Sequence, residues 1–323
     1  MKSENFDQVG PIVYLEKKRV SGNGSKPLFW AIASGKGGVG RSFFTSSLGI
    51  TLSRQGYRVL IVDLDQNGGN LHSWMGTLVK NKNISDYYRG TDSIKNYITT
   101  LDHEKLCLIA GDTCQWNDPD VYKRDVSDLI ADLKSQPFDI VLFDLSAGCE
   151  DHHKDILLKV DETFLMTTPE ATSIEKTYRW IENYIMKVVL NAEDARQLCE
   201  FNKKRMQAEP GGKASFYIVR NYLEELRKKN EDESIPFGPL KLVINQARNY
   251  EDDRLGEPIR SICNKFYFLD IQAVGSIQYD NAVWQCSRQR VPVLIHQPFN
   301  PLVGQIQALV KHLVDQTSQR AVV

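Results

Sequence analysis

The sequence predicts an α/β fold with a doubly wound, mainly parallel sheet and helices on both faces. Three observations lead to this prediction: short apolar runs rich in β-branched residues, amphipathic stretches between them, and a glycine-rich turn after the first run. Buried parallel strands read as continuous apolar runs, and helices connect them. The predicted strands are residues 28–33, 57–62, 106–110, 138–143, 163–167, 240–244 and 271–274.

Helical spacing follows several of these strands. After the first strand, Phe44, Leu48 and Leu52 recur every four residues, and Gly56 ends the pattern. Apolar residues recur with a similar period over 174–185, after the fifth strand. The last stretch, 301–319, also carries an apolar stripe, with Lys311 as its one Lys or Arg. A membrane-targeting helix needs a basic face as well, so we expect this helix to pack in the core.

Composition and charge narrow the class of protein. The chain has 323 residues, 41% of them hydrophobic, with 40 Lys plus Arg against 41 Asp plus Glu. Disordered and fibrous classes are excluded, and near-neutral charge argues against bulk attraction to DNA or an anionic membrane. The cysteines form no CxxC pair, and neither a secretory signal nor a membrane span is evident. We therefore expect reduced thiols and a cytoplasmic location.

Two regions differ from the regular alternation. Residues 1–26 are expected to be a polar N-terminal extension, and 27–323 one domain. Within that domain, 191–238 is predicted to be a mainly helical insertion. Because this segment holds nine basic and nine acidic residues, a solvated helical pair is favoured over a nucleic-acid patch.

The glycine-rich turn has the form of a phosphate-binding loop. It lies between a predicted strand and a predicted helix, the context that such a loop requires. Glycines let backbone N–H groups surround a polyphosphate, the helix N-terminus adds positive charge, and a hydroxyl can ligate Mg²⁺. The predicted binding residues are Gly35, Lys36, Gly37, Gly38, Val39, Gly40, Arg41 and Ser42.

One position departs from the GxxxxGK[ST] pattern, because Arg41 replaces the lysine. Arginine keeps the charge but is longer, planar and forked, whereas lysine is a compact charge. The sequence therefore predicts nucleotide binding and leaves rapid hydrolysis open.

The loop resembles the deviant Walker A motif of the MinD/ParA family of P-loop ATPases, which has a lysine directly after the first glycine. Lys36 occupies that position. In the family this lysine reaches the partner's nucleotide across a dimer. The resemblance thus implies ATP and Mg²⁺ as cofactors, homodimerisation on ATP binding, and catalytic roles for Lys36, Arg41 and Asp65.

Two carboxylates end the second predicted strand, at Asp63 and Asp65. Residues two apart on a strand point to the same side, at the sheet edge where a parallel sheet places its site. The resemblance implies that Asp65 activates the attacking water and that Asp63 supports the metal. The alternative is that these aspartates only cap a helix.

A Walker B pattern ends at Asp144, after the apolar run 138–143. Its carboxylate is predicted to hold Mg²⁺ together with Ser42. The following residues resemble the family's D-x-P-A-G switch, with Ser146 in place of proline. His152 and His153 come next and are expected to be polar surface residues.

Later segments extend the resemblance to about residue 315. Residues 168–174 resemble the P-E-x-T-S-I segment of the family's flagellar-placement branch, FlhG or FleN, where Thr172 or Ser173 is expected to begin a helix. Asn245 matches the asparagine that meets the adenine, although it could instead cap a helix before Asp252. The resemblance implies a slow, FlhG-like ATPase that acts through a protein partner. Two alternatives stay open: a non-hydrolysing nucleotide-bound scaffold, because of Arg41, and a ParA-like DNA-associated ATPase. Any membrane association is expected to be weak and peripheral.

Overall fold

The computed structural model describes residues 26–65, 68–78, 82–101, 105–111, 123–190, 193–200, 215–229 and 240–320. The predicted N-terminal extension therefore lies almost wholly outside the described residues. Within the predicted insertion, residues 193–200 and 215–229 are helical.

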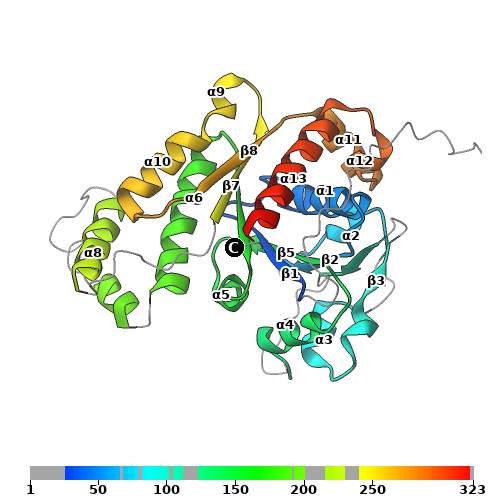
Figure 1. Cartoon of the computed structure of the whole chain (residues 1–323), viewed down its shortest axis with the longest axis horizontal. Coiled ribbons are helices and arrows are strands. Elements are labelled where there is room, and N and C mark those ends of the chain that lie inside the picture. The colour runs from blue at the N-terminus through cyan, green and yellow to red at the C-terminus, as the bar shows by residue number, and fades with distance from the viewer. Residues whose placement is uncertain are drawn as a thin grey trace, which may run out of the picture.

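One twisted sheet of eight strands forms the centre of the protein (Figure 1), with the order β3-β4-β2-β5-β1-β6-β7-β8. Every pairing is parallel except that of β3 with β4. The strands are β1 (Leu28–Ser34), β2 (Val59–Leu64), β3 (Thr99–Thr100), β4 (Leu106–Ile109), β5 (Ile140–Ala147), β6 (Glu162–Thr167), β7 (Leu240–Ala247) and β8 (Gln272–Gln278). This confirms the predicted fold class.

Helices cover both faces of the sheet, and each face has its own apolar cluster. One face carries α3 (Ile84–Arg89), η1 (Ile94–Tyr97), α4 (Val126–Lys134), α5 (Asp151–Leu157), α6 (Ala171–Tyr184) with η3 (Ile185–Val189), α8 (Ser215–Lys229) and α10 (Gly256–Tyr267). The other face carries α1 (Arg41–Arg54), α2 (Leu71–Trp74), α11 (Asn281–Gln289), α12 (Val293–His296) and α13 (Pro301–Arg320). The short α9 (Tyr250–Asp253) follows β7.

The last helix packs into the core, as its sequence predicts. The buried side chains of α13 include Leu302, Val303, Ile306, Val310 and Leu313, and the helix contacts α1 and β8. Its apolar stripe is therefore covered by the protein itself. None of the helices in the described part of the chain is both long and apolar enough to span a bilayer.

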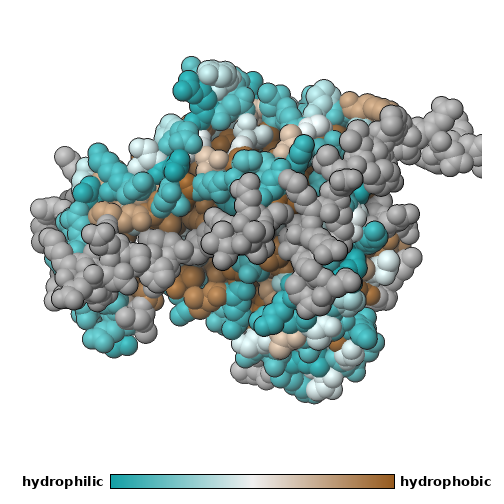
Figure 2. Space-filling model, in the orientation of Figure 1, coloured by the Kyte–Doolittle hydropathy of each residue, from teal (hydrophilic) through white to brown (hydrophobic). Residues whose placement is uncertain are grey.

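The surface seen in Figure 2 is largely hydrophilic over α9, whereas hydrophobic side chains gather near α5.

Among the described cysteines, Cys149, Cys263 and Cys286 are buried, Cys107 is half-buried and Cys199 is exposed, and all five are free thiols.

Candidate functional site

The phosphate-loop residues join the end of β1 to the start of α1. Gly40 lies directly before α1 in the left-handed region, with φ 91°, which favours glycine. A side chain there would also collide with Asn245, whose amide nitrogen would lie 2.2 Å from an added Cβ. Gly35 is similarly confined, because an added Cβ would lie 2.1 Å from the backbone oxygen of Lys176 in α6. The loop is thus fixed against α6 and β7.

Arg41 lies at the centre of a polar network rather than in solvent. Its guanidinium donates to the Ser34 hydroxyl at 2.8 Å, to Asp65 at 2.8 Å and to Asp144 at 3.2 Å. The Arg41 side chain is 8% exposed and that of Asp144 only 1%. In this structure the guanidinium therefore bridges the end of β1, the residue after β2, and the Walker B strand β5.

The predicted metal ligands Ser42 and Asp144 lie together. The Ser42 hydroxyl donates to Asp144 Oδ2 at 2.7 Å, and Thr45 in the next turn of α1 donates to Asp144 Oδ1 at 3.2 Å. Hydroxyl and carboxylate oxygens are the donors that Mg²⁺ prefers. The donor set therefore fits a Mg²⁺ ion next to a polyphosphate, and both metal roles stay predictions.

Asp63 has a different environment from Asp65. It is fully buried beside its register partner Asp144, and its two oxygens accept from the backbone N–H groups of Asp65 and Leu71, both at 3.1 Å. Burial, followed by the charge of Asp144, raises the pKa of Asp63 to about 7. Asp63 thus shapes the loop after β2, and its role at the metal stays a prediction.

Burial also raises the pKa of Asp144, while Arg41 and the Ser42 hydroxyl oppose that shift. Three carboxylates, those of Asp63, Asp65 and Asp144, converge where the central strands end, and Arg41 offsets part of their charge. Such a cluster attracts a further cation, which agrees with the expected Mg²⁺ chemistry.

The side chain of Lys36 is held within its own chain. Its ammonium lies 2.6 Å from Glu170 Oε2 and 3.3 Å from the Thr172 hydroxyl, and this contact lowers the pKa of Glu170. The Lys36 side chain is 38% exposed and that of Glu170 is 59% exposed. Exposed ion pairs contribute little to stability, so Lys36 can leave this contact at small cost.

A cavity of about 600 Å³ adjoins the loop and brings several predicted residues together. Its lining includes Gly37, Gly38, Gly40, Arg41, Ser42, Asp65 and Asn245. Asp63 and Asp144 lie behind this lining rather than on it. The cavity lies within the size range of small-ligand sites.

Several lining residues escaped prediction. Gln246 adopts φ 59° and donates its amide to the Gly38 carbonyl at 3.2 Å. The aromatic side chains of Trp74, Tyr279 and Trp284 also line the cavity. Because they come from α2, the end of β8 and α11, no local motif could have grouped them.

Asn245 contacts the phosphate loop, and it does not cap a helix. Its amide donates to the Val39 carbonyl at 2.7 Å. The cap of α9 is Asn249 instead, whose side chain accepts from the Asp252 N–H. The capping alternative is therefore wrong, and the adenine contact stays a prediction.

The expected start of the helix after β6 is corrected. The helix α6 begins at Ala171 after Glu170, so Thr172 and Ser173 lie in its first turn. The Ser173 hydroxyl still accepts from the Thr168 N–H, at 3.1 Å. A side-chain hydroxyl in the first turn of the helix thus accepts the backbone N–H of a residue just before the helix.

The expectation of a surface position is wrong for His153, which is 1% exposed. Its Nδ1 accepts from the Glu150 N–H at 3.4 Å, and its Nε2 lies 2.9 Å from the Ser146 hydroxyl. An imidazole that accepts at Nδ1 carries its proton on Nε2, which then donates to Ser146. His153 therefore ties both ends of the loop between β5 and α5.

Comparisons with known proteins give matches in sequence and in fold. A family model described as "ParA: NUBPL iron-transfer P-loop NTPase" matches residues 28–191, about half of the chain. The chain is 31% identical over 154 residues to the septum site-determining protein MinD of Bacillus subtilis, covering 46% of this chain and 56% of that protein. It is 29% identical over 205 residues to the flagellum site-determining protein YlxH of Helicobacter pylori, covering 61% and 66%.

Solved structures show the same fold. The septum site-determining protein MinD of Pyrococcus horikoshii, complexed with Mg-ADP, superposes with a TM-score of 0.60 at 19% identity, covering 89% of this chain and 96% of that one. In sequence, the chain spans about half the length of the curated relatives it matches.

Proposed function

The chain belongs to the MinD/ParA family of P-loop NTPases, and from this premise we propose that it binds Mg-ATP and works as a nucleotide-dependent dimerisation switch. The observation that carries the proposal is the network in which Arg41 joins Asp65 and Asp144 beside the loop glycines. It joins the expected catalytic carboxylate to the expected metal-binding carboxylate through one side chain.

Each loop residue has a part in this proposal. The backbone of Gly37–Gly40 and the N-terminus of α1 hold the phosphates, and Ser42 with Asp144 holds Mg²⁺, which supplies charge neutralisation when bound. Added Cβ atoms at Gly37 and Gly38 would meet nothing within 4 Å, so the space beside the loop is open for a ligand.

Hydrolysis is proposed to be slow. In this proposal the Asp65 carboxylate gives up its 2.8 Å contact with Arg41 before it orients a water molecule. A hydrogen bond between charged groups is worth about 1.5–3 kcal/mol, and the cost of breaking it adds to the barrier.

Lys36 is proposed to move from Glu170 to the nucleotide of a second copy. Lys36→Ala should then leave ATP affinity within about threefold of the wild type while abolishing the ATP-dependent dimer. Titration calorimetry gives the affinity and light scattering the mass. Lys95→Ala removes an exposed lysine from η1 and is the matched control. If the wild-type protein keeps the mass of a monomer in the presence of Mg-ATP, the switch is refuted.

The process that is switched is proposed to be the placement or number of a polar structure such as the flagellum. The similarity to YlxH of Helicobacter pylori supports this choice, because that protein is named for determining a flagellar site and shows the longer match. Deleting the gene and counting flagella per cell tests it, with Lys36→Ala and Lys95→Ala as complementing variants. Unchanged flagellar number and position would refute the flagellar role and leave the nucleotide switch intact.

A non-hydrolysing, nucleotide-bound scaffold is a second candidate, favoured by the three hydrogen bonds that hold Arg41. Steady-state phosphate release separates the two candidates. If Asp65→Asn abolishes turnover and the exposed control Glu251→Gln leaves it unchanged, the scaffold is excluded. Tight ATP binding without any turnover would exclude the hydrolysing switch.

A further inference from the structure

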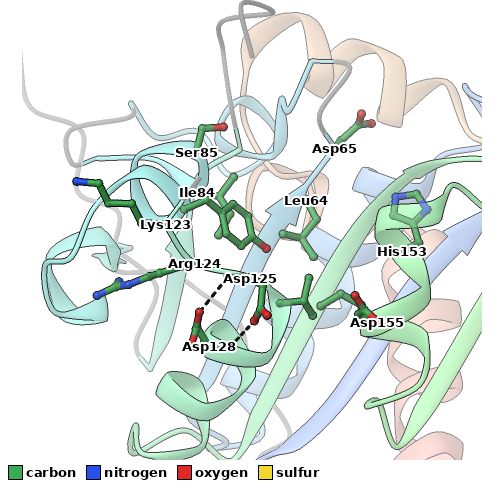
Figure 3. A pocket seen from close by; sticks show the side chains of 13 residues that line it. Leu64, Asp65, Ile84, Ser85, Lys123, Arg124, Asp125, Asp128, His153 and Asp155 are labelled. Atoms are coloured by element: carbon green, nitrogen blue, oxygen red, sulfur yellow. Dashed lines mark hydrogen bonds between the residues drawn. The ribbon is translucent and has the colours of Figure 1, made fainter. Parts of the chain in front are cut away.

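A second cavity, of about 510 Å³, lies beside the nucleotide cavity. Its walls come from the end of β2, from α3, from the start of α4 and from α5 (Figure 3). Asp65 is the lining residue that it shares with the nucleotide cavity. Phosphate-loop residues do not line it, so the loop's role in binding phosphate does not account for this space.

The floor of the second cavity is apolar. Leu64, Ile84 and Ile156 line it and are buried, with 7%, 3% and 1% of their surface exposed to solvent. Val126 and the ring of Tyr88 are half-buried and complete the apolar part. Pockets for organic ligands combine such a floor with a few polar groups.

The rim of the cavity is acidic. Asp125, Asp128 and Asp155 line it and are exposed. Asp125 and Asp128 also accept backbone N–H groups at the start of α4, which fixes their positions.

The two basic lining residues do not balance this charge inside the cavity. The Arg124 guanidinium lies over the Tyr87 ring, 4.5 Å from its centroid, donates to the Asp92 carbonyl at 2.9 Å and lies 4.0 Å from Asp132. Figure 3 shows Lys123 and Arg124 extending away from Leu64 and Asp155. Among the described lining residues, apolar walls are thus combined with acidic side chains at the rim and with basic side chains that point elsewhere.

We propose that this cavity is a binding site for a small organic cation with an apolar body. The body would pack on Leu64, Ile84 and Ile156, beside the Tyr88 ring, whose face also attracts cations. The cationic group would lie at the rim near Asp155. Anionic ligands are disfavoured by the same carboxylates.

The site is placed to affect nucleotide binding, an extension that rests on the proposed function. Asp65 lines both cavities and bonds Arg41, while His153 lines the second cavity and bonds Ser146 near the end of the Walker B strand β5. A ligand whose body packs on Leu64, next to Asp65, and whose cationic group lies near Asp155 would alter the surroundings of both Asp65 and His153. Occupancy of the second cavity should therefore change the ATP affinity at least twofold.

Three indole compounds of similar size test the charge preference: tryptamine, its alcohol analogue tryptophol, and indoleacetate. Titration calorimetry with the full chain, without nucleotide, should show tryptamine binding at least fivefold more tightly than tryptophol, and indoleacetate most weakly. Equal affinity for tryptamine and tryptophol would overturn the proposal. Because no nucleotide is present, this failure is distinct from a failure of the ATP switch.

Paired variants locate the binding. Asp155→Lys should weaken tryptamine binding at least fivefold, whereas Glu251→Lys, the same charge change on α9, should leave it within twofold. Tyr88→Ala should weaken all three compounds, and Tyr250→Ala, at an exposed position on α9, none. Thermal unfolding confirms that each variant is folded. Equal tryptamine affinity of Asp155→Lys and the wild type would overturn the site.

A last measurement separates a small ligand from a protein segment of the same chemistry. An acetylated Leu-Lys-Leu amide presents one lysine between apolar side chains. If tryptamine binds and the peptide does not, the small-ligand site is supported. Peptide binding without tryptamine binding would overturn it in favour of a protein partner.

Discussion

Replacing Arg41 by lysine restores the usual residue of the loop, and the structure predicts two opposite effects. The guanidinium reaches Ser34, Asp65 and Asp144 at once because its nitrogens are spread over a fork. A lysine ammonium is a single point on a flexible stem, so it can keep the bond to Asp144 but must release Asp65 or Ser34. Arg41→Lys therefore destabilises the nucleotide-free protein while freeing Asp65 for the proposed chemistry.

The magnitude follows from the bonds lost. Each buried bond to a charged group is worth about 1.5–3 kcal/mol, and the positive charge itself is kept. Losing one or two of them lowers the free energy of unfolding by about 1.5–6 kcal/mol. If breaking the bond between Arg41 and Asp65 costs about 1.5 kcal/mol before hydrolysis, its removal raises turnover about tenfold.

Denaturant titration without nucleotide and with a chelator measures the first effect, and steady-state phosphate release at saturating Mg-ATP the second. Arg58→Lys is the matched control, since Arg58 also pairs bidentately with a carboxylate, that of Asp139, but is 51% exposed. It should cost no more than about 1 kcal/mol. An Arg41→Lys protein as stable as wild type, or one with lower turnover, would contradict the reasoning.

Three further predictions follow from buried groups. His153→Phe keeps the ring but leaves the Ser146 hydroxyl and the Glu150 N–H without their partner, so the free energy of unfolding should fall by about 1–3 kcal/mol in denaturant titration; no change would show that His153 does not tie the loop. Lys241→Met removes the buried partner of Glu162, 3.4 Å away, and should lower the free energy of unfolding by about 3–5 kcal/mol. A second substitution, Glu162→Met, should restore part of this loss. A double variant that is less stable than Lys241→Met alone would contradict this. Burial raises the pKa of Cys149 to about 11 and that of Cys263 to about 12, so at pH 8 both thiols stay protonated. Iodoacetamide should therefore alkylate exposed Cys199 before either of them, with Cys149 and Cys263 labelled only on unfolding, as mapped by mass spectrometry.

Local patterns were enough to predict most of the fold. The seven predicted strands all occur in the sheet, because buried parallel strands are continuous apolar runs that stand out from amphipathic helices. The strand that prediction missed is β3, Thr99–Thr100. Two polar residues at a sheet edge give no apolar run, and only their antiparallel pairing with β4 defines them.

Only part of the lining of the candidate site was predicted from the sequence, and its geometry was not. The glycine spacing identified the loop residues, yet nothing local shows that Arg41 bonds Asp65 from another strand. Likewise His153 looked like a surface residue, because its contact with Ser146 depends on how α5 packs against the end of β5. Contacts between residues far apart in sequence depend on strand order, which spacing does not encode.

The packing of α13 against α1 has a consequence for synthesis of the chain. The phosphate-loop helix emerges early, but the side chains that cover it, such as Ile306 and Val310, are made roughly 260 residues later. At roughly 5–20 residues per second, α1 waits about 13–50 s for that cover. During this interval part of the apolar cluster on that face of the sheet lacks its cover, and exposed apolar surface of this kind is prone to aggregation. A stop codon before residue 301 would leave that surface permanently open and direct the product to degradation rather than to a shortened ATPase.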